Sequence, residues 1–565
     1  MASDRLIQIP DPVHGYIPVE PRFLDIIDTL EFQRLRSIEQ GSFRPVFPGA
    51  RHDRFIHSLG TYHLATRFVE HFFKNLRRDV KGIRLTAQME EDLKLTFRYA
   101  ALLHDVGHAP FSHTTEDLFK EKKDPATGLS AIWTELCRQI SLHAAPADHL
   151  RFRDSTKKAV GAAHEIMSAT ILLRSHDAFT AGSKWKGIHV DPELAARMII
   201  GYPYSDKDTD AAGLTDEEIQ LRGIKNCLIG LLNSSTMDVD RMDYLARDTQ
   251  MSGYTNAPVD LDCLARSVTA VKNEKNWLVP AFRDQAIPVI DTMFHAKLSH
   301  DIGVLALPAG AYDAALREHC IRTIDAAGIA AGLPSYISTV FTVDALSNGN
   351  VTWNGKRYRL LCDADILSDL DARDGAPFDE LLTRLPGKRR TAAWRSYYEF
   401  RHIFTYQDST TADDVYKYFQ PLLQYMKDNH IFVFNADSYA RIVRSSDPLV
   451  RQTADFLKTF LTGLTTDPVK KAAFNVVLLE RSHNLTMKID PADVRIVFPG
   501  STVPLRPDAR NYSTYAELTG ITKDDKRLKN YFFLYRHGGL GHRQLARLRD
   551  RVAVMIQARR AQGLM

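Results

Sequence analysis

Four side chains that can bind a metal or carry a proton lie within ten positions of one another in the segment LLHDVGHAPFSH. His104 and Asp105 are adjacent, and His108 and His113 follow them. Neutral imidazole and carboxylate groups bind first-row divalent metals, and a metal held in this way can also contact phosphate oxygens. A His-Asp pair recurs by chance, so a metal site requires further ligands from elsewhere in the chain.

Two other segments offer such ligands. In RFIHSLGTYHLATRFVEHFF, His57 begins a stripe at helical spacing that ends at Phe72, so we expect it on the buried face of a helix, with Arg54 one turn earlier. A histidine in this position is otherwise an ordinary core residue. The segment DVDRMDYLARD places charged and aromatic side chains on one helical face, which either serves a site or simply faces solvent. These side chains belong to Asp240, Asp243, Tyr244, Arg247 and Asp248.

The elements that position these residues are predicted to be helices. Apolar periodicity predicts one helix over 89–105, and Gly107 then breaks it, so the two histidines that follow are expected in a loop. Another helix is predicted to start near Ala162, with His164 on its first turn, and a third to start near Val239.

The rest of the chain predicts a minor β component. Alternating apolar residues predict a hairpin over 6–19, and the Asn-Gly pair after Trp353 marks a second hairpin. We therefore expect a mainly α-helical protein with a smaller α+β part toward the C-terminus. Three further segments have β character: residues 430–445, 473–480 and 493–504.

The composition is that of an ordinary globular protein. The 565 residues include 73 basic and 69 acidic side chains, and this near balance does not favour a nucleic-acid partner. The basic clusters at 388–390 and 543–560 fit solvated surface, with a polyanion site as the alternative. The five cysteines are scattered without a CxxC pair, which indicates a reducing compartment. Neither a signal peptide nor an apolar run of membrane length is evident, so we expect a cytoplasmic protein with no membrane partner.

The order of these motifs resembles that of a known family. RFIHSLG, LLHDVGHAPFSH and DVDRMDYLARD supply the pattern H…HD…D of the HD-domain phosphohydrolases. The segments DPVHG, FQRLRSIEQ and VFPGARHD narrow the resemblance to the dGTPase-like deoxynucleoside triphosphate triphosphohydrolases, over residues 7 to about 300. It implies an HD-domain helical core with an N-terminal hairpin over 1–300, and an α+β C-terminal lobe over 301–565 for oligomerisation or regulation. Because the match starts close to Met1, no sterile alpha motif domain is expected before it.

The resemblance implies roles for individual residues. His113 matches the proposed general acid for the departing 5′ oxygen, and Glu116 stands where the family commonly has an Asp that orients it. His108 and His164 match histidines that contact the triphosphate. The implied cofactor is one divalent ion per subunit (Mn, Fe, Mg, Zn, Co or Ni), with a second Mg accompanying the nucleotide. The metal ligands are matched by His57, His104, Asp105 and Asp240.

Further matches concern bound nucleotides. The family's contacts to substrate phosphate and sugar are matched by Arg54, Gln40, Arg241, Tyr244 and Asp248. Arg241 replaces a lysine, which keeps the charge but changes its geometry. The residues that bind an activating guanine nucleotide are matched by Asp28, Gln33 and Arg36. Because such effector sites form between subunits, the resemblance implies a homo-oligomer, either a tetramer or a hexamer.

Three features depart from the family pattern. Gly41 stands where the family has a bulky residue, and Asp291 falls close to the place of a tyrosine that packs against the sugar. Both positions help to exclude a 2′-hydroxyl, so the sequence does not establish selectivity for deoxyribose. Residues 117–163 form a longer connection than usual, which we interpret as a lid, an oligomer contact or an inert insertion.

The resemblance implies a metal-dependent hydrolysis in which water attacks the α-phosphorus of a dNTP, with dGTP among the substrates. The products would be a deoxynucleoside and tripolyphosphate. One alternative is another HD-type phosphohydrolase, acting as a nuclease or phosphodiesterase on nucleic-acid ends or hydrolysing ribonucleotides. A second is a nucleotide-sensing protein that is not an enzyme. The balanced charge disfavours the nuclease, and the complete ligand set disfavours the sensor.

Overall fold

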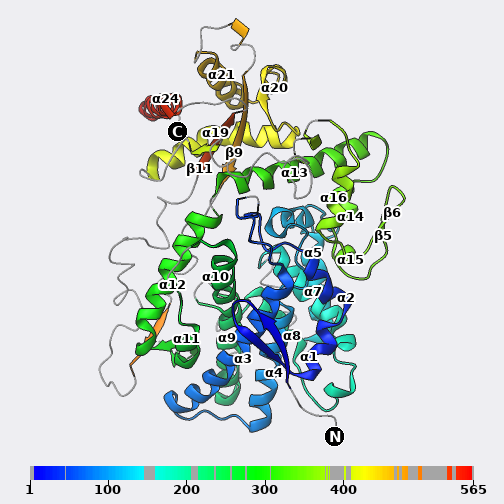
Figure 1. The fold of residues 1–565 in the computed structure, drawn as a ribbon, viewed down its shortest axis with the longest axis vertical. Helices are drawn as coiled ribbons and strands as arrows, with labels where there is room; N and C mark the ends of the chain where they lie inside the picture. The colour runs from blue at the N-terminus through cyan, green and yellow to red at the C-terminus, as the bar shows by residue number, and fades with distance from the viewer. Residues whose placement is uncertain are drawn as a thin grey trace.

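The computed structural model shows a mainly helical protein, as predicted, with a helical body in the lower part of Figure 1 and a smaller α+β lobe above it. No helix among the described residues combines the length and the apolar character needed to cross a membrane. The structure describes residues 6–562 except position 45 and the segments 145–159, 205–213, 235–236, 255–257, 274–276, 306, 376, 380, 382–399, 403–408, 464–467, 470–473, 482–493, 499–530 and 537–541.

The chain begins with the predicted hairpin. Strands β1 (Ile7–Asp11) and β2 (Gly15–Val19) pair in antiparallel fashion along their whole length. Helices α1 (Pro21–Ile27) and α2 (Leu30–Gln33) follow, and a single 3-10 turn over Arg34–Ser37 leads into the loop before the next helix. This first section packs one face into the core, where Phe23, Ile26 and Ile27 of α1 and Phe32 of α2 are buried.

Six helices form the body that carries the site. The side chain of Asp53 caps the first of them by accepting a hydrogen bond from the backbone of Ile56, and the apolar stripe predicted after His57 is buried. The second helix packs along the first and ends at Leu103, directly before the His-Asp pair. The six are α3 (Arg54–Asp79), α4 (Ala87–Leu103), α7 (Ala163–Phe179), α8 (Pro192–Ile200), α9 (Asp216–Leu232) and α10 (Val239–Ser252).

A small sheet closes the far side of this body. Strand β3 (Val268–Lys272) pairs antiparallel with β4 (Leu278–Arg283), and β10 (Arg495–Val497) pairs parallel with β4. The C-terminal part of the chain therefore returns to the helical body. Helix α11 (Leu261–Ser267) contacts this sheet, and α12 (Ile287–His300) and α13 (Pro308–Ala330) follow along the chain. Helix α5 (Ala131–His143) packs against α7 instead.

The segment after α13 packs on the helical body near α7 and contains the second predicted hairpin (Figure 1). Asn354 and Gly355 both have positive φ, of 46° and 77°, as the tight turn between its strands requires. The elements of this segment are α14 (Tyr336–Val340), α15 (Val343–Leu346), β5 (Val351–Trp353), β6 (Lys356–Tyr358) and α16 (Asp363–Asp371).

The upper lobe is built on a four-stranded sheet in the order β7-β11-β9-β8. One prediction for it was wrong in part: of residues 430–445, only Phe434–Asn435 form a strand, and Ala436–Ile442 form a helix because Asn435 caps it through Ser438. The elements are β7 (Phe400–His402), α19 (Ser409–Asp428), β8 (Phe434–Asn435), α20 (Ala436–Ile442), α21 (Pro448–Thr462), β9 (Asn475–Arg481), β11 (Tyr531–Arg536) and α24 (His542–Ala561).

The described residues contain two sizeable apolar cores. The larger core lies in the helical body and extends past residue 300, because Tyr312, Trp353 and Ile366 belong to it. The smaller core joins α19, α21, β9 and α24 in the upper lobe. The division at 300/301 stays a prediction, and the larger core shows that the segment up to α16 packs with the helical body.

Candidate metal and proton-transfer site

Three helices bring His57, His104 and Asp240 together, and we refer to these residues as the metal group. His57 lies on the first turn of α3, His104 directly follows α4, and Asp240 lies on the first turn of α10. His57 Nε2 is 2.9 Å from Asp240 Oδ1, and His104 Nε2 is 3.3 Å from His57 Nε2. One ligand atom from each residue lies within 4.8 Å of the other two, so these atoms can hold one metal ion.

Asp105, the fourth predicted ligand, lies beside the metal group. Its Oδ1 atom lies 3.6 Å from His104 Nε2, and its Oδ2 atom lies 3.7 Å from His57 Nε2. The guanidinium of Arg54 donates to Asp105 over 2.8 Å and also to the carbonyl of Gln40 over 2.9 Å. Arg54 therefore fixes the position of Asp105 and joins the metal group to the segment that carries Gln40.

The donor atoms of the two histidines suit a divalent cation. Nδ1 of His104 donates to the carbonyl of Ala101 over 2.9 Å, and Nδ1 of His57 donates to Asp243 over 2.8 Å, so both Nε2 atoms are free to act as ligands. Burial opposes a charge on His57, but its hydrogen bonds to Asp240 and Asp243 outweigh this effect and raise its pKa to about 10. Such an electron-rich site attracts positive charge, which a divalent metal would supply.

Buried charges support the metal group from behind. Asp243 is fully buried and accepts from Arg247 through both oxygens, at 2.8 and 3.0 Å. Arg247 also donates to Asp11 over 2.8 Å, and His14 lies 2.6 Å from Asp243. The polar face of α10 thus points inward here, and the interpretation that it faces solvent was wrong for Asp243 and Arg247. The sequence indicated this support only through the helical spacing and the DPVHG segment.

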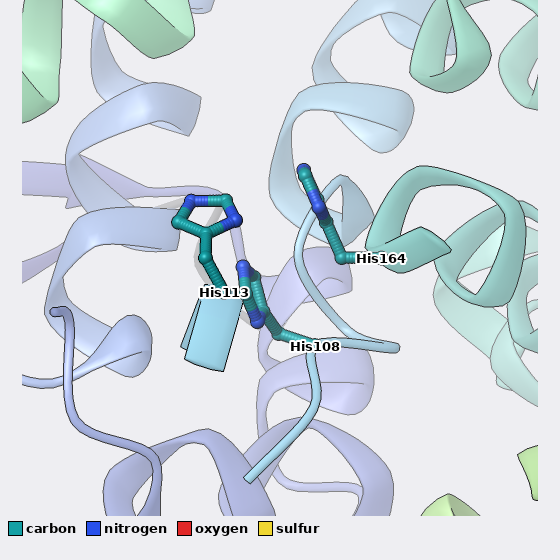
Figure 2. Close-up of side chains that lie close together, drawn as sticks. All are labelled: His108, His113 and His164. Carbon is teal, nitrogen blue, oxygen red and sulfur yellow. The ribbon is translucent and has the colours of Figure 1, made fainter. Parts of the chain in front are cut away.

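His108, His113 and His164 form a second group next to the metal group, which we call the histidine cluster. Their ring centres lie 4.6 to 5.1 Å apart, and the rings of His108 and His164 are stacked at 14° (Figure 2). Glu116 lies 2.7 Å from Nδ1 of His164 and 3.3 Å from Nδ1 of His113. The structure therefore brings together the four residues for which the sequence predicted catalytic roles.

The charges in the histidine cluster are unequal. His108 is fully buried, and burial lowers its pKa well below the usual range, helped by Arg54 and His164. Burial also opposes a charge on His164, but Glu116 outweighs it and raises the pKa of His164 to about 9. Burial opposes the charge on Glu116, while His113 and His164 hold its pKa well below the usual value. The side chain of His113 is 60% exposed, so it can meet a substrate.

The loop that carries His108 and His113 has an unusual backbone. Phe111 and Ser112 have positive φ, of 56° and 52°, which side chains other than glycine rarely adopt. Gly107 approaches the backbone of α7 at Met167 and Ser168 so closely that a Cβ atom would collide with it. This close approach brings the start of α7, and therefore His164, against the loop.

Residues from beyond the helical bundle hold this loop in place, and we call Asp363 and Arg34 the loop clamp. Asp363, the first residue of α16, accepts from the backbone of Phe111 over 2.7 Å and from the backbone of Glu39 over 2.9 Å. Arg34 donates to the carbonyl of His108 over 2.8 Å and to that of Leu361 over 2.7 Å. Sequence reasoning missed the loop clamp entirely.

Charged residues surround the loop clamp. The guanidinium of Arg317, on α13, lies 4.5 Å from the centre of the Phe111 ring and pairs with Glu39. Burial and the nearby Glu39 raise the pKa of Asp363 to about 7, against the backbone hydrogen bonds that it accepts.

The predicted substrate residues lie around the metal group. Gln40 is buried and Arg241 is paired with Asp238 at 3.4 Å. Asp248 joins two histidines, with His52 at 2.7 Å and His300 at 3.0 Å. The Tyr244 ring lies 5.7 Å from that of His300. The structure places these residues along α10 and beside it, and their contacts with substrate stay predictions; His52 and His300 were not singled out from the sequence.

The predicted effector residues lie on the surface away from these groups. Asp28 is exposed at the end of α1, and Arg36 is exposed and donates to Gln33 over 2.9 Å. The Arg36 guanidinium lies 3.6 Å from the centre of the Phe55 ring. Their role as an effector site stays a prediction.

The structure also places the three features that depart from the family pattern. A Cβ at Gly41 would meet only the tip of the Phe43 side chain, and Asp291 lies on α12 near His295. The long connection over 117–163 contains α5, while its residues 145–159 are outside the described part of the chain.

Part of the chain matches a known protein family. Residues 54–182 match the family model described as "HD domain". Deoxynucleoside triphosphate triphosphohydrolase SAMHD1 of Bos taurus is 44% identical over 256 residues, which are 45% of this chain and 37% of that protein. SAMHD1 of Danio rerio is 44% identical over 290 residues, which are 51% of this chain and 40% of that protein. The uncharacterized protein YwfO of Bacillus subtilis is 31% identical over 258 residues, which are 45% of this chain and 42% of that protein.

These alignments cover only about two fifths of each of those relatives. A hypothetical protein from Aquifex aeolicus has a similar fold, with a TM-score of 0.52 over 97% of this chain and 99% of that one, at 18% identity. The recognition of the HD pattern from the sequence is confirmed. The chain therefore carries an HD domain over residues 54–182, and about half of its length is similar to deoxynucleoside triphosphate triphosphohydrolases.

Proposed function

We propose that this protein is a metal-dependent triphosphohydrolase that cleaves dNTPs, dGTP among them, to a deoxynucleoside and tripolyphosphate. One observation carries the proposal: the metal group and the histidine cluster lie side by side, joined through Arg54 and the loop after α4. A cation site next to an exposed histidine that a carboxylate orients supplies both charge neutralisation and a proton donor. The similarity to named dNTP triphosphohydrolases supports the choice of substrate.

The side chains divide the reaction between them. A divalent cation held by the metal group and Asp105 would supply Lewis acidity. His113 would donate a proton to the 5′ oxygen as the bond between that oxygen and the α-phosphorus breaks, and water would supply the oxygen that stays on the phosphorus. Glu116 contacts Nδ1 of His113 at 3.3 Å, so it would orient the His113 ring for this donation. His108 and His164 would bind the triphosphate, whose charge His164 helps to offset.

Several further features belong to the same proposal. A guanine nucleotide would activate the enzyme at Asp28, Gln33 and Arg36, in a homo-oligomer. The cation would be one divalent ion per subunit (Mn, Fe, Mg, Zn, Co or Ni), with a second Mg bound to the nucleotide, because all of these metals accept imidazole and carboxylate ligands to some degree. We also expect the protein to work in the cytoplasm.

The deciding experiment is product analysis with Mn²⁺ and each dNTP, alone and in mixtures, with ribonucleotides in parallel. Tripolyphosphate and a deoxynucleoside in equal amounts would support the proposal. Hydrolysis that requires a guanine nucleotide in the mixture would support the effector site. Monophosphate with pyrophosphate, or cleavage of ribonucleotides only, would favour a different HD phosphohydrolase, and binding of nucleotides without any product would favour a sensor.

A further inference from the structure

The histidine cluster contains an imidazole whose position costs free energy. His108 is completely buried, and neither of its ring nitrogens has a hydrogen-bond partner among the described residues. Buried polar atoms are nearly always paired, because an unpaired one loses its hydration without compensation, at a cost of about 1–3 kcal/mol. A fully buried imidazole that faces two others therefore requires an explanation beyond packing (Figure 2).

The other two histidines are oriented so that each offers a free nitrogen. Glu116 contacts Nδ1 of His164 and Nδ1 of His113, which leaves Nε2 of both rings available. A carboxylate that holds the outer nitrogen of an imidazole is the usual support of a metal-binding histidine, since it fixes the tautomer and strengthens the ligand. One carboxylate supports two ligands here.

The distances fit a single ion. One nitrogen from each of the three residues lies within 4.8 Å of the other two. Zinc binds imidazole nitrogen at about 2.0–2.1 Å in a tetrahedron, which places neighbouring nitrogens roughly 3.3 Å apart. The rings would have to move together slightly. His113 can make this movement because its side chain is exposed and lies in a single 3-10 turn over Ser112–Thr114.

We propose that the histidine cluster is a second metal site, distinct from the metal group, that takes a cation with a preference for nitrogen ligands such as Zn²⁺. Three neutral imidazoles favour Zn²⁺, Co²⁺, Ni²⁺ or Cu²⁺ over Mg²⁺ and Mn²⁺, which prefer oxygen. Binding displaces the proton that Glu116 stabilises on His164. The three nitrogens leave a fourth position open.

Metal binding by the histidine cluster does not depend on the proposed function. Only the expected inhibition of hydrolysis rests on that function. A cation on His113 occupies the nitrogen that would otherwise donate a proton to the leaving oxygen. The second equivalent of zinc should therefore inhibit hydrolysis.

Zinc bound per subunit tests the proposal directly. The full-length protein, its metal first removed by chelation, is dialysed against excess Zn²⁺ at neutral pH, and bound zinc is measured by emission spectrometry. We expect two ions in the wild type, one in His104→Ala, one in His113→Ala and none in the double variant. His113→Ala is preferred to a variant of the buried His108, because an exposed side chain can be removed with little effect on folding.

A matched control and a second metal complete the test. His71→Ala removes a histidine from α3 outside both groups and should still bind two ions. Co²⁺, added in steps, should give a visible absorption band from the second equivalent that is absent in His113→Ala. If His113→Ala binds as much zinc as the wild type, or His104→Ala binds none, the proposal is wrong. Failure of the proposed function would show itself differently, as two bound ions but no hydrolysis of dNTPs with Mn²⁺.

Discussion

The metal group and the histidine cluster are neighbours, but the protein holds them in opposite ways. The metal group comes from helix ends, and the buried Asp243 and the carbonyl of Ala101 hold the outer nitrogens of its two histidines. Two members of the histidine cluster lie in an irregular loop with positive φ, which the loop clamp holds from a distant part of the chain. Helix ends thus position the residues that would hold a cation, while the loop clamp holds the irregular loop whose histidines would move a proton.

The strongest test of this comparison removes a ligand from the metal group. We expect Asp240→Ala to lower the rate of dNTP hydrolysis by more than about a thousandfold, because a metal contributes several kcal/mol to the transition state. Bound Mn²⁺ should fall in parallel, as measured by emission spectrometry. Full activity in this variant would show that the cation site lies elsewhere.

Removing the proposed proton donor should distinguish the function of the histidine cluster from that of the metal group. We expect His113→Ala to lower kcat by about 100- to 10,000-fold, the usual contribution of general acid catalysis. The Mn²⁺ content of the metal group should stay unchanged, since His113 is not part of it. A loss of Mn²⁺ together with activity would mean that the two groups form one site.

The support behind the metal group should affect the cation more than the chemistry. Asp243→Asn removes the charge that holds His57 and Arg247, so we expect Mn²⁺ affinity to fall by about 10- to 100-fold. The free energy of unfolding should also fall, by about 1–3 kcal/mol, because the buried Arg247 would keep only Asp11 as a charged partner.

Asp79→Asn is the matched control for this variant. Asp79 is a half-buried residue at the end of α3 that pairs with Arg283 at 2.7 Å, away from the site. It should lose stability but keep its Mn²⁺ affinity, as titrations of the folded protein would show. Equal losses of affinity in both variants would show that general destabilisation, rather than the contact with His57, is responsible.

The loop clamp should affect the histidine cluster alone. Asp363→Asn keeps one acceptor oxygen but weakens the hold on Phe111 and Glu39, so we expect kcat to fall roughly 10- to 100-fold through misplacement of His113. Mn²⁺ affinity should not change. Asp369→Asn, in the same helix, alters contacts to Tyr336, Tyr358 and Lys356 instead and should keep the wild-type kcat. An unchanged kcat in Asp363→Asn would show that the loop holds its shape without the clamp.

The smallest expected effect is on the pH dependence of stability. The pKa of His164 is raised to about 9, so the pairing with Glu116 stabilises the fold fully below the usual histidine value near 6.5 and is lost as pH rises through about 9. At low pH it is lost again as Glu116 becomes protonated. The difference in unfolding free energy between the wild type and Glu116→Gln, from urea titrations, should therefore be about 1–3 kcal/mol at pH 6 and shrink toward pH 10. A difference in unfolding free energy that grows with pH would show that the pair of His164 and Glu116 is not responsible.

Sequence reasoning reached the metal group more easily than the histidine cluster for a physical reason. Helical periodicity predicted that His57 faces the core and that Asp240 lies on a polar helical face, because regular elements repeat their geometry. His108 and His113 lie in a loop without periodicity, so their grouping with His164 depended on the resemblance to a family.

The loop clamp had no local signal at all. Asp363 is 252 positions from Phe111, and an acidic residue at the start of a helix is ordinary because it complements the helix dipole. Arg34 was one more basic residue in a short amphipathic stretch, and only the folded chain shows it reaching the carbonyl of His108. Contacts of this kind depend on the tertiary fold and cannot be read from spacing.

The late position of Asp363 has a consequence for synthesis on the ribosome. The last member of the metal group, Asp240, precedes Asp363 by 123 residues. At about 5–20 residues per second, translation of this interval takes roughly 6–25 s, and N-terminal regions fold while the rest of the chain is made. A nascent chain would therefore be able to collect its cation before its proton-transfer loop is fixed. We expect hydrolysis to begin only when the segment with Asp363 has left the ribosome, so that an unfinished chain would bind metal without consuming nucleotides.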